Sequence, residues 1–167
     1  MPKPTPFGKY IRRAKALGAQ GAKVISPNEV FCAEWVRLKC QFGCGGYGRS
    51  LMCPPHSPTP EQTRRVLDCY SSILIVHCKR WADVDEIVVT LEREMFLDGY
   101  YKALAYGAGP CNLCGTCDTE TPCEHPDRAR PAMEASGIDV FATARKAGYP
   151  IEVVRSRDDD ENYFGLV

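Results

Sequence analysis

The sequence lacks a long apolar segment, because none of its hydrophobic runs approaches the roughly 18 residues that a membrane-spanning helix needs. Prolines at positions 2, 4 and 6 interrupt its beginning, and the apolar core of a signal peptide does not follow them. A phosphate-binding glycine motif, a flavin fingerprint and a hydrolase triad are also missing. These absences predict a cytoplasmic protein with no membrane partner, and they give nucleotide-dependent and hydrolytic enzymes no support.

An excess of one charge is missing as well, since 21 Lys and Arg residues balance 21 Asp and Glu residues. The charges are nevertheless uneven. Residues 1–49 hold nine basic and two acidic residues, whereas residues 151–167 hold two basic and five acidic ones. A solvated basic face and an acidic loop are the simpler interpretation, with an acidic protein partner as the alternative. Basic residues without interleaved aromatic ones predict no nucleic-acid partner. The oligomeric state stays open.

The hydrophobic periodicity predicts alternating helices and strands. Helices are expected over residues 7–17, from residue 60 onward, over 83–98 and over 139–147, because apolar residues recur there at helical spacing. Strands are expected over residues 22–26 and 30–38 as a hairpin, over 72–78, 101–106 and 151–155, with a final apolar segment over 163–167. Residues 1–167 therefore read as a single α/β domain, a central sheet flanked by helices with two cysteine-rich loops.

The more informative of these loops has overlapping cysteine spacings. Cys111, Cys114 and Cys117 form a Cys-x-x-Cys-x-x-Cys run, and Cys123 follows closely. Structural zinc sites usually take two thiolates from each of two separate segments, whereas this run is the bacterial ferredoxin pattern. A reducing cytosol also disfavours structural disulfides. The spacing therefore favours an iron-sulfur cluster over zinc.

A second group of cysteines precedes it, at Cys40, Cys44 and Cys53, within a loop rich in glycine and proline. Glycine lets backbone N–H groups approach cluster sulfides closely, and proline after Cys53 fixes the chain direction without offering an amide. Inert cysteines are more often buried in regular elements than strung along such a loop. These three residues are therefore predicted to bind metal.

The two groups hold seven cysteines, one fewer than two four-thiolate clusters need. Cys32 and His56 are candidates for the missing ligand, and an open iron is the remaining alternative. Cys69 and Cys78 are expected to be small core residues, and His77 a hydrogen-bonded core histidine. Cys53 precedes proline, as does the crossing ligand of two-cluster ferredoxins, so that it is also a candidate for the Cys111 group.

In these segments the chain resembles a family of predicted metal-binding proteins, defined by a domain of unknown function and found in anaerobic bacteria and archaea. Four motifs carry the resemblance: Lys39-Cys40-x3-Cys44-x2-Tyr47-Gly48, Cys53-Pro54-Pro55, Gly109-Pro110-Cys111-x2-Cys114-x2-Cys117-x5-Cys123-x2-Pro126, and Arg130-Pro131-x-Met133-Glu134-x2-Gly137-Ile138-Asp139-Val140. The resemblance implies metal binding and neither a reaction nor a substrate.

Three functions are compatible with this pattern. The first is an iron-sulfur protein with two [4Fe-4S] clusters that transfers electrons between protein partners, which requires a redox partner protein. The second is an enzyme in which an open iron of the Cys40, Cys44, Cys53 cluster binds a small sulfur or carbonyl substrate. The third is an interaction module stabilised by zinc. Two roles are open for His125, a hydrogen-bond donor to a cluster sulfur or an exposed loop histidine.

Overall fold

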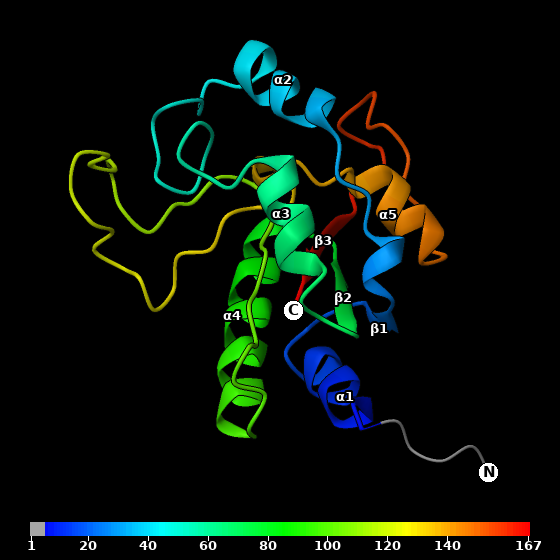
Figure 1. The fold of residues 1–167 in the computed structure, drawn as a ribbon. Helices are drawn as coiled ribbons and strands as arrows, with labels where there is room; N and C mark the ends of the chain where they lie inside the picture. Colours follow the sequence, from blue (N-terminus) through cyan, green and yellow to red (C-terminus); the bar gives the residue numbers. More distant parts are fainter. Residues whose placement is uncertain (1–5) are drawn as a thin grey trace.

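An antiparallel sheet of three strands lies at the centre of the structure, a computed structural model that describes residues 6–167 (Figure 1). The middle strand is β2 (Ile73–Cys78), and it pairs with β1 (Gly21–Ile25) on one side and β3 (Tyr163–Leu166) on the other. In the register, Val76 lies opposite both Ala22 and Gly165. The chain thus brings its last strand back to the centre of the fold.

Helices cover both faces of this sheet. Their bounds are α1 (Gly8–Ala16), α2 (Glu34–Gly43), α3 (Pro60–Leu67), α4 (Trp81–Leu97) and α5 (Val140–Lys146), with short 3-10 turns η1 (Pro27–Glu29) and η2 (Glu134–Ser136). No helix within residues 6–167 is both long and apolar enough to cross a membrane. The predicted α/β class is confirmed, with all strand pairs antiparallel.

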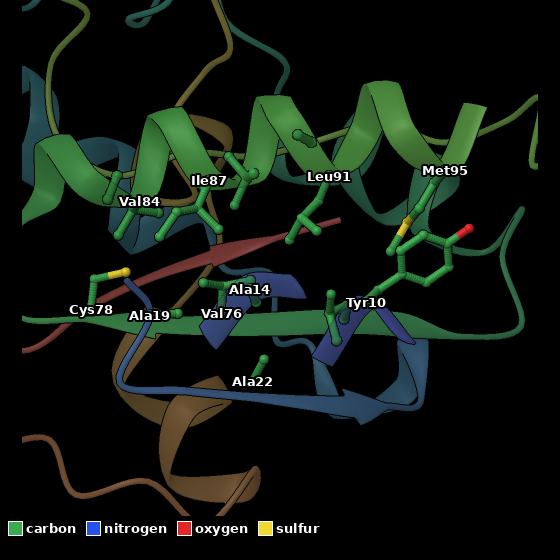
Figure 2. Close-up of a cluster of buried hydrophobic side chains, with 14 residues drawn as sticks. Tyr10, Ala14, Ala19, Ala22, Val76, Cys78, Val84, Ile87, Leu91 and Met95 are labelled. Carbon is green, nitrogen blue, oxygen red and sulfur yellow. The ribbon is translucent and has the colours of Figure 1, made fainter. Parts of the chain in front are cut away.

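Alternate residues of β2 enter two separate cores. Leu74 and Val76 pack with buried side chains of α1 and α4, and Figure 2 shows Val84, Ile87 and Leu91 of α4 directed at this side of the strand. Ile73 and Ile75 pack on the other side, among buried residues of α5 and β3. Every residue of β2 is buried, as the continuous apolar run predicts. At about 25 cal/mol per Å² of apolar surface, this burial is the main stabilising term of the fold.

Several helix ends follow the signals of the sequence. Thr59 caps α3 through a reciprocal pair with Gln62, whose side chain accepts a hydrogen bond from the Thr59 amide. Asp139 caps α5 by accepting from the Ala142 amide. The predicted start of α4 at Asp83 is wrong. This helix begins at Trp81 after Arg80, and Asp83 forms an ion pair with Arg80 instead.

Three predicted strands are wrong. Residues 30–38 hold no strand, because α2 begins at Glu34 and carries Cys40 inside the helix. In the segment 101–106 only Tyr106 pairs, as an isolated bridge to Leu166, and the Ala105 amide is bound by the Glu92 carboxylate instead. Residues 151–155 are irregular as well. Side chains rather than a neighbouring strand satisfy the backbone there, with Arg145 donating to the Ile151 carbonyl.

The 132–137 segment holds the ends of both cysteine loops. Next to the Cys111 loop, Gly107 and Ala132 form a parallel bridge in which the Gly107 amide donates to Pro131 and the Met133 amide to Gly107. Next to the Cys40 loop, the Ser57 hydroxyl donates to the Ala135 carbonyl at 2.5 Å. The Thr63 hydroxyl donates to the Ser136 carbonyl at 2.7 Å. One short segment therefore fixes where both loops leave the fold.

Gly137 ends this segment and leaves no room for a side chain. Its φ of +76° is left-handed, and an added Cβ would collide with the Pro60 ring. Gly148 has a similar φ of +80°, but the nearest atom to its added Cβ is Lys23 Nζ at 3.4 Å. The two glycines therefore share a backbone conformation, but only Gly137 lacks room for a side chain.

We predict that Gly137→Ala lowers the free energy of unfolding by about 3 kcal/mol, from the left-handed penalty plus overpacking. Gly148→Ala, which carries only the backbone penalty, should lose about 1 kcal/mol. Urea unfolding under anaerobic conditions measures both values. Equal losses in the two variants would contradict the tight contact between Gly137 and Pro60.

Candidate metal centre

Cys40, Cys44 and Cys53 come together from a helix and the loop that follows it. Cys40 lies in the last turn of α2, and Cys44 follows the final residue of that helix. Cys53 lies within the loop that is closed by the hydrogen bond from the Gly48 amide to the Pro54 carbonyl. The Arg37 guanidinium donates to the Ser57 and Pro58 carbonyls and so fastens the end of the loop to α2. The structure therefore brings together the two segments that carry the three predicted ligands.

Gly46 lies beside two of these thiols. An added Cβ on Gly46 would lie 3.5 Å from Cys44 Sγ and 3.9 Å from Cys53 Sγ. The Gly46 amide donates to Cys44 Sγ at 3.4 Å. Backbone N–H groups directed at sulfur are a common feature of iron-sulfur sites, where they stabilise the charge on the thiolates. The glycine-rich loop thus acts as a cradle for sulfur atoms.

The second group gathers around a cavity of about 320 Å³. All four of its cysteines, Cys111, Cys114, Cys117 and Cys123, line that cavity. The His125 amide donates to Cys123 Sγ at 3.4 Å, so a hydrogen bond from His125 to sulfur exists but comes from its backbone and not from its ring. Residues 49–52, which precede Cys53, form another part of the cavity wall. The two cysteine loops therefore adjoin.

Cys53 is close to thiols of both groups. Burial raises the pKa of its thiol, and the neighbouring Cys44, Cys111 and Cys117 thiols raise it further. The structure thus keeps open the crossing role for Cys53 that its following proline indicates. It also places the two groups side by side, as the loops of residues 40–58 and 108–130 on the same side of the fold show (Figure 1).

The thiols repel one another once they ionise. Burial, the Cys44 and Cys53 thiols and then the Glu134 carboxylate all raise the pKa of Cys40. Desolvation, Glu124 and the other three thiols of its group raise the pKa of Cys114. A bound cation removes this repulsion, because metal ligands are thiolates and metal binding releases their protons. The donor set, the amides directed at sulfur and the cavity fit thiolate-bound metal.

The remaining cysteines and histidines lie elsewhere. Cys32 pairs with Ile138 beside Arg64 and Asp68, away from both groups, and Cys78 is buried in β2 as predicted. Cys69 is exposed, so its prediction as a core residue is wrong. His77 is buried, stacks on Phe164 and bonds to Asn162 as expected. His56 is exposed, and its amide donates to the Cys53 carbonyl.

Sequence reasoning missed three carboxylates at this centre. Glu124 and His125 offer ligand atoms that lie, together with Cys114 Sγ, within 4.8 Å of one another. Glu134 lies beside Cys40. Asp85 lines the same cleft as Cys111, and its Oδ1 accepts a hydrogen bond from the Ala108 amide at 2.9 Å. Glu124 and Glu134 stand within or next to the motifs, a signal that the sequence offered.

This arrangement defines a cysteine-rich metal-binding protein. The chain belongs to the family described as predicted metal-binding protein (DUF2284), whose family model matches residues 23–167. The suspected resemblance is thereby confirmed, and the match includes all seven cysteines of the two groups. No curated protein and no solved structure matches the chain.

Asp85 positions the start of the Cys111 loop at an energetic cost. A Cβ on Gly107 would collide with Asp85 Oδ1, so the glycine lets this carboxylate reach the Ala108 amide. Burial raises the pKa of Asp85 to about 6. At a pH between the ordinary pKa of 3.8 and the raised pKa of about 6, Asp85 therefore holds a proton in the folded state that it has released in the unfolded state. The carboxyl thus destabilises the fold increasingly as the pH rises through this window.

We predict that Asp85→Asn gains stability relative to the natural protein as the pH rises, by about 0.5 kcal/mol at pH about 4 and by about 3 kcal/mol at pH about 7. Urea unfolding across this range measures the difference. Asp98→Asn is the opposing control, because hydrogen bonds from Lys9 and Tyr10 lower the pKa of Asp98 and its removal should cost stability as the pH rises. A pH-independent difference for Asp85→Asn would contradict its burial cost.

Proposed function

We propose that this protein binds two [4Fe-4S] clusters and transfers single electrons between protein partners. The observation that supports the proposal best is the gathering of seven cysteines into two adjoining groups with Cys53 near thiols of both. Each cluster, when bound, accepts and releases one electron. Neighbouring clusters are a suitable arrangement for passing electrons through a protein, whereas two structural zinc ions gain nothing from proximity.

The exposed face of α2 is the surface that we propose for the redox partner. Trp35, Leu38 and Phe42 are 50%, 52% and 80% exposed, and they share one face of the helix because they are spaced by three and four residues. Cys40 and Val36 occupy other positions of the helix, where Val36 is buried and Cys40 is half-buried. An apolar stripe thus lies directly outside the first cysteine group.

The charges around the stripe indicate the chemistry of the partner. Lys39 and Arg49 are exposed beside Cys40 and Cys44, and neither forms an ion pair within residues 6–167. An apolar centre with a charged rim is the usual anatomy of a transient interface, and complementary charge speeds encounter. We therefore propose a small acidic electron-transfer protein as the occupant of this surface.

A second function, an enzyme that acts on a small substrate, is favoured by one observation, although it lies beside the Cys111 group and not beside the Cys40, Cys44, Cys53 group expected to hold an open iron. A cleft of about 750 Å³ separates α4 from the cysteine loop, with Cys111, Arg93 and Arg128 in its walls. Asp85 also lines it, with a pKa raised by burial to about 6. A carboxyl that titrates near neutrality beside a metal ligand is a plausible proton donor to a small sulfur or carbonyl substrate.

The composition of the protein purified without oxygen tests the proposal. We predict about eight iron atoms and an equal amount of acid-labile sulfide per chain, because two [4Fe-4S] clusters contain equal numbers of both. Iron, zinc and sulfide analyses measure this directly. Stoichiometric zinc without sulfide would contradict the proposal and support the zinc-stabilised module, for which Cys114, Glu124 and His125 form a ready group of ligands.

The partner surface is tested by reversing its chemistry. With a reduced acidic [2Fe-2S] ferredoxin as the probe, we predict that Leu38→Glu and Phe42→Glu each lower the second-order rate of electron transfer about tenfold, because both add repulsion and remove apolar contact. The controls are Phe96→Glu and Leu97→Glu at the far end of α4, which are 56% and 69% exposed and lie away from α2 (Figure 1). Stopped-flow absorbance measures the rates.

Equal rates in all four variants would contradict the docking surface. Loss of a dimer in the α2 variants, measured by sedimentation velocity, would instead assign the stripe to a second copy of the chain. Raising the salt concentration should slow the natural protein and have less effect on Lys39→Glu, because screening acts on charges that are still complementary.

A further inference from the structure

The first cysteine group lacks a fourth thiolate, and within residues 6–167 the other three cysteines lie away from it. Cys32 is held against Ile138 near Arg64, Cys78 is buried in β2, and Cys69 is exposed after α3. His56 has an exposed side chain, although its backbone bonds to Cys53. A cluster bound by Cys40, Cys44 and Cys53 therefore needs a ligand of another kind, or it keeps an open iron.

Glu134 is the carboxylate that the fold directs at this group. It lies in η2, which packs against α2, the helix that carries Cys40. The next residue, Ala135, accepts the hydrogen bond from Ser57, four residues after Cys53. Glu134 is therefore flanked by both segments that supply the three thiols. Its charge is close enough to Cys40 to act on that thiol.

The surroundings of this carboxylate are unusual for a structural residue. Glu134 is exposed to solvent, but desolvation by neighbouring protein atoms raises the pKa of its carboxyl. Within the described residues it has no hydrogen bond or ion pair with a side chain of another residue. Partial desolvation of a carboxylate costs free energy, which a bound cation would offset.

Nearby acidic groups make the position still less favourable for an unpaired charge. The Asp85 carboxylate raises the pKa of Glu134 in addition to the effect of desolvation, and Glu134 in turn raises the pKa of the Cys40 thiol. Metal coordination relieves all of these repulsions at once. Carboxylate oxygen is a known ligand of iron and zinc, harder and more easily displaced than thiolate.

We infer that Glu134 is the fourth ligand of the metal cluster held by Cys40, Cys44 and Cys53. The inference rests on the proposed function, since it concerns the ligands of a cluster that the proposal supplies. It resolves the odd number of cysteines, because seven thiolates and one carboxylate complete two four-ligand sites. It also gives the first cluster a ligand that a small molecule can displace, unlike the all-cysteine group of Cys111, Cys114, Cys117 and Cys123.

The test compares electron paramagnetic resonance spectra of the reduced protein and its iron content. In Glu134→Gln, the signal of one cluster should change and that of the other should persist, and mild oxidation should release one iron atom per chain. In Glu134→Cys, the iron content should match the natural protein, the same signal should shift, and added cyanide should no longer alter it. Glu120→Gln, which changes an exposed carboxylate of the other loop, is the control and should leave both signals unchanged.

Natural spectra and iron content in both Glu134 variants would overturn the inference. If Glu134→Gln does not fold, Glu134→Cys decides alone, since an unshifted signal that still responds to cyanide contradicts ligation. The natural protein separates this inference from the proposed function. Absence of iron and sulfide from it defeats the proposed function, whereas two normal cluster signals that are indifferent to residue 134 defeat only the role of Glu134.

Discussion

Hydrogen bonding of the 132–137 segment is the constraint on which the rest of the centre depends. The bridge between Gly107 and Ala132 closes the Cys111 loop, and the bond from Ser57 to the Ala135 carbonyl ties the Cys40 loop to the same segment. The Arg130 and Glu92 ion pair, with both side chains largely buried, secures the loop from the side of α4. Loops with little apolar content are thereby placed by a few backbone contacts to a well-packed core.

The core supplies the rigidity that these contacts need. Met133 and Ile138, at the two ends of this segment, are fully buried together with Ile75 of the central strand. The loop ends are therefore anchored in the well-packed core, while the thiols of the loops repel one another once they ionise. Metal binding is what turns the tips into an ordered site, because it supplies the positive charge that the surrounding side chains do not provide.

The sequence was sufficient for the parts of the fold that depend on local pattern. The continuous apolar run of β2, the capping pair of Thr59 and Gln62 and the cap at Asp139 all identify their elements correctly. It failed at α2, where Phe31, Trp35 and Val36 indicate a strand by composition. This segment is helical and packs against η2, which lies about a hundred residues further along the chain. Such a tertiary contact overrides the local preference for a strand.

The candidate centre also has one part that the sequence predicts and one part that it does not. Spacing alone indicates the seven cysteines, because a loop that wraps metal repeats its ligands at short intervals. The adjacency of the two groups and the carboxylates beside them depends on long-range contacts, so no spacing reveals them. Glu134 is separated from Cys40 by the length of most of the domain, and only the packing of η2 against α2 brings the two together.

The spin count and line shape of the fully reduced protein test the central claim, that two neighbouring clusters occupy these two loops, most directly. Electron paramagnetic resonance should give two spins per chain, with lines broadened by magnetic coupling between clusters as close as Cys53 requires. The broadening should disappear when only one cluster is reduced. A single sharp spectrum of one spin, or no signal from reduced protein that contains its full metal, would contradict the account.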